Sequence, residues 1–163
     1  CINLKNYKKI PPFYNPQGAR GEDTFMSTAL KDLNVLKVPC YTFHDGFSMY
    51  NHLLNGVLPV ELKSIQTNDK GVLSRFIQAS KGWVRYKPLL VYITEKDKYD
   101  EIIQMMRKNL QITIPKLCKY FHNYEFKSIL IEFEKYVKAV PQHFSEFEKT
   151  KYIWHKLMLN GIN

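Results

Sequence analysis

The stretch Asn15-Pro16-Gln17-Gly18-Ala19-Arg20-Gly21-Glu22-Asp23-Thr24-Phe25 joins a turn-rich loop to an apparent helix. Asp23 or Thr24 is suited to cap that helix, because a short side-chain oxygen accepts hydrogen bonds from N–H groups of the first turn. The pattern predicts a carboxylate pair, Glu22 and Asp23, at the edge of a loop with a packed helix behind it. The apolar residues that recur at helical spacing and predict its buried face are Phe25, Met26, Ala29, Leu30 and Leu33.

An adjacent pair of carboxylates in this position has two interpretations. Acidic residues are common at helix starts, because the helix dipole favours negative charge there. The same position suits a catalytic base, because the dipole keeps the carboxylate ionised and the packed helix holds it in place. Short motifs are unspecific, so the pair alone does not separate the two roles.

The surrounding sequence adds an ordered set of features. Pro12-Phe13-Tyr14 precedes the stretch, residues 35–43 have the composition of a short strand, and His44-Asp45-Gly46 closes that strand. In this order the features resemble the acceptor-side half of a GT-A glycosyltransferase catalytic domain, notably of its family-2-like members. The resemblance covers roughly residues 1–50.

This resemblance implies a role for three residues. Asp23 matches the base that deprotonates the acceptor hydroxyl, Glu22 its acceptor-side neighbour, and His44 a ligand of the Mg²⁺ or Mn²⁺ ion on the donor diphosphate. The implied reaction transfers a sugar from a nucleotide sugar to a glycan or another hydroxyl acceptor. Inversion is expected if Asp23 is the base, and retention stays open as the alternative. Taken alone, His44 is more typical of a hydrogen-bonded structural residue. As a metal ligand it needs a partner for its second ring nitrogen, and Asp45 is one candidate.

Three further residues of the loop are candidates for substrate binding. Arg20 offers a planar fork to a phosphate or carboxylate, or it is a solvated loop residue. Gly21 allows the backbone to approach a ligand closely. Tyr14 either stacks on a sugar ring or anchors the loop in the core.

The expected fold class is an α/β fragment followed by a mostly α-helical region. Residues 1–66 are expected to form the acceptor-side, C-terminal half of a GT-A nucleotide-diphospho-sugar transferase domain, and residues 67–163 the helical region. GT-A enzymes place a nucleotide-binding half with an Asp-x-Asp motif before this point, and no Asp-x-Asp occurs in the 163 residues. We therefore expect the chain to be a piece of a longer enzyme and to be inactive when isolated.

Apolar stripes predict three helices after Lys96, and an earlier helix is expected to end before Pro88. Residues 89–94 fit either a strand or the first turn of the next helix. Pro115 and Pro141 fit the first turns of helices. The stripes suit core faces, and an amphipathic surface for a membrane or a partner is the alternative. They consist of Tyr99, Ile102, Ile103, Met106 and Leu110, then Phe126, Ile129, Leu130, Phe133 and Val137, then Phe144, Phe147, Ile153, Trp154, Leu157 and Met158.

The chain is basic, with a formal net charge of +9. Such a surface favours anionic partners: a nucleotide sugar, an anionic polymer, a peripheral membrane contact or nucleic acid. The three cysteines, Cys1, Cys40 and Cys118, show no metal-ligand spacing, which favours a reducing compartment. No apolar stretch reaches membrane-spanning length. We predict a cytoplasmic location, with the membrane surface as an open alternative.

Two other classes of function stay open. One is a non-catalytic basic helical module that binds nucleic acid, a membrane surface or a protein. Nucleic-acid binding with a steep salt dependence would favour this class. The other is a metal-dependent hydrolase that uses Glu22, Asp23, His44 and Asp45, for which tight metal binding by the isolated chain would speak.

Overall fold

The computed structural model describes residues 10–29 and 70–160, and 85% of these residues are helical. No strand occurs within the two described ranges, so the predicted α/β fold class is wrong for them. The strand expected at residues 35–43 lies outside the described residues. The helices are α1 (Glu22–Ala29), α2 (Lys70–Thr94), α3 (Tyr99–Phe121), α4 (Lys127–Lys138) and α5 (Val140–Asn160), with short 3₁₀ turns η4 (Lys96–Lys98) and η5 (Tyr124–Phe126) before α3 and α4.

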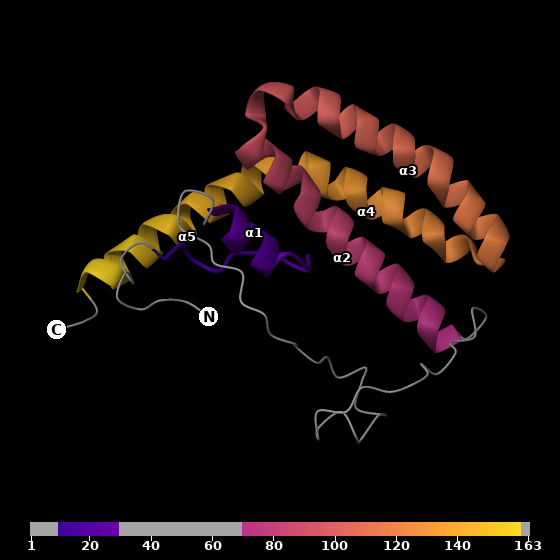
Figure 1. Cartoon of the computed structure of the whole chain (residues 1–163), viewed down its shortest axis with the longest axis horizontal. Coiled ribbons are helices and arrows are strands. Elements are labelled where there is room, and N and C mark those ends of the chain that lie inside the picture. The colour runs from indigo at the N-terminus through magenta and orange to yellow at the C-terminus, as the bar shows by residue number, and fades with distance from the viewer. Residues whose placement is uncertain (1–9, 30–69, 161–163) are drawn as a thin grey trace, which may run out of the picture.

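Helices α2, α3 and α4 pack together, with α4 lying between the other two (Figure 1). Helix α5 extends away from the end of α4, and α1 lies beside it (Figure 1). The second predicted stripe contributes Phe126 and Ile129 to the buried cluster of this three-helix unit, and of the first stripe only Leu110 packs against it. Its buried members are Leu73, Ile77, Ile114, Cys118, Phe126 and Ile129.

A second apolar cluster joins the N-terminal segment to the helices. Tyr14 and Phe25 come from residues 10–29, and Tyr86 and Leu89 come from α2. Phe147 of α5 closes the cluster, with its ring centroid 5.3 Å from that of Tyr14 and 6.1 Å from that of Phe25. The predicted helix after Gly21 is confirmed, and its first apolar residues are buried as expected.

Helix α2 does not end before Pro88, as the sequence had predicted, but continues through it to Thr94. A proline inside a helix removes one backbone hydrogen bond and crowds the preceding turn, at a cost of about 3 kcal/mol. Leu89 and Val91 are buried just beyond it, and each contributes about 1.5–3 kcal/mol. The free energy gained by burying these two side chains therefore outweighs the helix-breaking effect of Pro88, and residues 89–94 are the last turns of α2.

The other two prolines behave differently from each other. Pro141 lies in the first turn of α5, as predicted. Pro115 lies inside α3, so the prediction that it opens a helix is wrong. It is flanked by the buried side chains of Ile114 and Cys118, which hold this part of α3 against α4.

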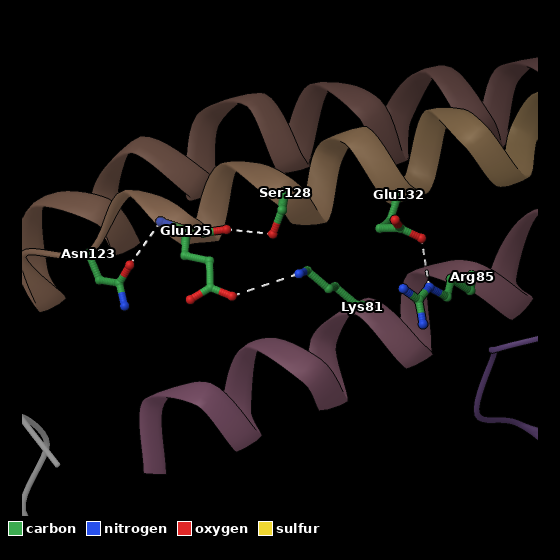
Figure 2. A network of polar contacts seen from close by, with 6 residues as sticks. All are labelled: Lys81, Arg85, Asn123, Glu125, Ser128 and Glu132. Carbon is green, nitrogen blue, oxygen red and sulfur yellow. Dashed lines mark hydrogen bonds and ion pairs between the residues drawn. The ribbon is translucent and has the colours of Figure 1, made fainter. Parts of the chain in front are cut away.

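Two ion pairs join α2 to the segment that contains η5 and α4 (Figure 2). Arg85 Nε donates to Glu132 Oε2 at 2.8 Å, and Lys81 Nζ lies 3.9 Å from Glu125 Oε1. Asn123 fixes the turn before α4, because its Oδ1 accepts from the backbone N–H of Glu125 at 2.8 Å.

Among the described helices, none is long and apolar enough to cross a membrane.

Candidate active site

The loop before α1 lies directly on the backbone of α2. The backbone N–H of Arg20 donates to the carbonyl of Gly82 at 3.1 Å. A Cβ at Gly82 would meet Arg20 Cγ at 2.8 Å and Cδ at 2.9 Å, so only a glycine lets the loop approach the helix this closely. The stem of Arg20 is therefore packed on α2, while the residue as a whole is exposed.

Two side chains from the helices hold the turn around Gly18. Arg85 Nη1 donates to the Gly18 carbonyl at 2.7 Å, while its Nε holds Glu132. The hydroxyl of Tyr136 donates to the Gln17 carbonyl. Gly18 has φ +73, a conformation that costs glycine little and other residues more. The loop is thus fastened to α2 and α4 before it reaches the carboxylate pair.

Gly21 is the last residue before α1, and it is buried against an aromatic ring. A Cβ at this position would lie 2.5 Å from Cδ1 and 2.6 Å from Cγ of Tyr86. Its carbonyl accepts the first helical hydrogen bond, from the N–H of Phe25 at 2.9 Å. Gly21 was predicted to bring the backbone close to a ligand, and in this structure the close approach is to Tyr86.

Glu22 and Asp23 form the exposed first turn of α1. Glu22 Oε2 accepts from the N–H of Gly21 at 3.1 Å, and Asp23 Oδ1 accepts from the N–H of Thr24 at 2.8 Å. The turn does not swing freely, because Phe25 and Met26 directly after it are buried at 5% and 7% exposure. The pair is therefore exposed to solvent and is held in place by the buried residues that follow it, as the sequence had predicted.

Tyr14 lies in the aromatic cluster rather than beside the carboxylates. Its ring packs edge-on against Phe25 and Phe147, and its hydroxyl donates to the carbonyl of His143 at 3.1 Å. Burial, with a smaller effect from Glu146, raises the pKa of Tyr14 to about 12, so the phenol stays neutral. Stacking on a sugar stays a prediction, and it would require the ring to leave this cluster. Of the two roles left open for Tyr14, the core role fits this geometry.

The described residues do not supply a metal site. No three His, Cys, Asp or Glu side chains gather closely enough within them to hold an ion. His44 and Asp45, the predicted metal ligand and its orienting partner, lie outside the described residues. Glu22 and Asp23 are adjacent in the chain and have no third ligand beside them in the described part.

Comparison of the chain with protein-family models, with curated proteins and with solved structures finds no match in any of the three. Arg20 and Gly21 end the docked loop, Glu22 and Asp23 begin α1, and Tyr14 lies in the aromatic cluster with Phe25.

Sequence reasoning missed the residues that hold this loop. They lie far from it in the chain: Tyr86 follows Gly21 by 65 positions, and Tyr136 follows Gln17 by 119 positions. A glycine in the middle of α2, Gly82, was the one local signal, because glycine in a helix interior is unfavourable unless something needs the space.

Proposed function

We propose that the chain belongs to a glycosyltransferase in which Asp23 is the general base. The observation that supports this is the carboxylate of Asp23, exposed at the start of a helix whose next residues are buried. One of its oxygens accepts from the Thr24 N–H, and the other has no hydrogen-bond partner within the described residues. A carboxylate with one oxygen free is able to take a proton from a hydroxyl that approaches from solvent.

In this reaction Asp23 accepts the proton of the acceptor hydroxyl. The hydroxyl oxygen forms a bond to the anomeric carbon of the donor sugar as the bond from that carbon to the phosphate oxygen breaks. The nucleoside diphosphate leaves with the electron pair. Glu22 adds a second negative charge next to the base, and Arg20 offers a cation from the loop, three residues before the base in the sequence. General-base assistance of this kind contributes about a hundred- to ten-thousandfold in rate.

The test is a sugar-transfer assay of the enzyme that carries this chain, with a panel of nucleotide-sugar donors. Asp23→Asn is expected to lower turnover by about a hundred- to ten-thousandfold while donor binding persists. Asp100→Asn is the matched control, because Asp100 is also an exposed carboxylate in the first turn of a helix. Near-normal turnover in Asp23→Asn, or an equal loss in Asp100→Asn, would falsify the assignment.

The alternative predicted class, a non-catalytic basic binding module, draws on different residues. This binding role is favoured by the solvent-facing lysines of α4, which are separate from the loop that carries Asp23. A binding role for these lysines is compatible with sugar transfer and is tested separately.

A further inference from the structure

Each carboxylate of η5 and α4 is paired with a cation of a neighbouring helix. Glu125 lies 3.9 Å from Lys81 and Glu132 lies 2.8 Å from Arg85, both across the boundary with α2 (Figure 2). Glu134 binds Arg107 of α3 in a bidentate pair, at 2.5 Å and 2.9 Å. Each of these acids therefore has a cationic partner on α2 or α3, and Glu134 also interacts electrostatically with Lys138.

The outer side of α4 carries three exposed lysines, Lys127, Lys135 and Lys138. Ile131 stands between them with 67% of its surface exposed. The four residues follow at intervals of four, four and three positions, so they share one side of the helix. None of the three ammonium groups forms an ion pair with a described residue, and Lys127 lies 5.2 Å above the ring of Tyr124. We call these four residues the α4 lysine face.

The face continues onto the end of α3. A hollow between the two helices is lined on the α3 side by Pro115, Lys119 and His122, and on the other side by Tyr124 and Lys127. A second, more open hollow along α4 is lined by Leu130, Ile131, Glu134, Lys135, Lys138 and Ala139. Between residues 102 and 124 the sequence has four Lys or Arg residues and no Asp or Glu. The surface therefore carries more positive than negative charge, with the exposed Ile131 among its lysines.

We propose that the α4 lysine face, with Lys119 beside it, docks the protein on an anionic lipid bilayer. Charge complementarity selects an anionic partner, because the carboxylates of this segment are already paired internally. An aliphatic side chain among lysines suits the boundary between headgroups and acyl chains, where Ile131 inserts and the ammonium groups remain at the phosphates.

Nucleic acid is the competing partner, and the face is less suited to it. Binding of single strands relies on aromatic side chains on which bases stack. Along α4 the two aromatic residues, Phe133 and Tyr136, are buried, and the exposed apolar residue is Ile131. Tyr124 is exposed but lies at the end of the face, beneath Lys127. The inference is independent of sugar transfer, because no residue of the loop takes part.

The experiment is co-sedimentation of the full chain with vesicles of phosphatidylcholine alone and with about one third phosphatidylserine. The chain is expected to bind the anionic vesicles, more weakly as salt rises, and to leave the neutral vesicles in the supernatant. Replacing Lys127, Lys135 and Lys138 together by glutamine is expected to weaken binding about a hundredfold, since each lysine near such a surface contributes about fivefold.

The matched control replaces Lys96, Lys98 and Lys149 by glutamine, which removes the same charge from exposed positions on η4 and α5. It is expected to bind anionic vesicles within about threefold of the unchanged chain. Ile131→Ser is expected to weaken vesicle binding by a larger factor at high salt than at low salt, because the apolar contact supplies more of the binding when the charges are screened. Far-ultraviolet circular dichroism checks that each variant keeps its helices.

Three outcomes overturn the inference. Equal losses in the two triple variants show that net charge alone governs binding. Absence of binding to the anionic vesicles removes the bilayer as the partner. Oligonucleotide binding that depends on Lys127, Lys135 and Lys138, without vesicle binding, assigns the face to nucleic acid. None of these outcomes bears on Asp23, so they leave the transferase assay to be decided by itself.

Discussion

Gly21 and Tyr86 are interlocked, since a Cβ on the glycine would lie 2.5 Å from Cδ1 of the ring. This contact sets the position at which α1 begins, because the carbonyl of Gly21 accepts its first helical hydrogen bond. The tyrosine is buried and belongs to the second apolar cluster. Small changes at either residue are therefore expected to reach the carboxylate pair.

We predict that Gly21→Ala lowers the free energy of unfolding by about 1–3 kcal/mol, because the added methyl overpacks a filled site. Urea denaturation followed by circular dichroism measures the change. Gly71→Ala is the control: this glycine is exposed in the first turn of α2, where alanine is expected to stabilise by about 0.5–1 kcal/mol. If Gly21→Ala costs the same in a Tyr86→Ala background as in the unchanged chain, the ring is not the obstacle.

Arg85 is predicted to resist replacement by lysine. It holds Glu132 through Nε and the Gly18 carbonyl through Nη1, and a single ammonium group cannot reproduce that fork. Arg85→Lys is expected to lower the free energy of unfolding by about 1–2 kcal/mol. It should also speed amide exchange in residues 18–21. Arg75→Lys, whose Nε bonds only the backbone of its own helix, is expected to change stability by less than about 0.5 kcal/mol. Equal effects of the two changes would contradict the bridging role.

His143 is expected to make the protein less stable in mild acid. Burial lowers its pKa, and Glu146 offsets part of that change. The unfolded chain then binds the proton more readily than the folded one, so stability falls as pH drops below the unfolded pKa, about 6.5, toward the lower folded pKa. Replacing His143 with glutamine should flatten this part of the curve of unfolding free energy against pH. A curve that is unchanged by the substitution would show that other groups cause it.

Glu134 is expected to affect the stability of the protein in a lower pH range than His143 does. Its hydrogen bond to Arg107 lowers its pKa, so the stability it contributes is present above the unfolded pKa and is lost as pH falls through the folded value. The difference in unfolding free energy between the unchanged chain and Arg107→Gln should therefore shrink below about pH 4. Urea is the suitable denaturant, because guanidinium chloride screens the pair. A difference that stays constant down to the acid limit would argue against the ion pair.

The parts of the fold that depend on local pattern were predictable from sequence. The apolar residues after Gly21 and the stripes of α3 and α4 repeat at helical spacing, and these helices are present. The end of α2 was not predictable, because a proline normally stops a helix and only tertiary burial of Leu89 and Val91 shows why Pro88 did not.

The candidate site was predicted in part. The exposed carboxylates and their buried support follow from a pattern of about ten residues. The contacts that hold the loop could not be predicted from that pattern. They come from residues on helices far along the chain, namely Gly82, Arg85 and Tyr136. The α/β fold class failed for a different reason: it was taken from a resemblance covering residues 1–50, and the described part of that segment is a loop and one helix.

The interlock of Gly21 with Tyr86 also constrains how the sequence can change over time. A larger residue at position 21 has no room unless position 86 becomes smaller, and a smaller residue at 86 leaves a void that glycine cannot fill. Among descendants that keep this arrangement, the two positions are expected to change as a pair. Such paired changes would be visible in any collection of relatives without measuring a single property of the protein.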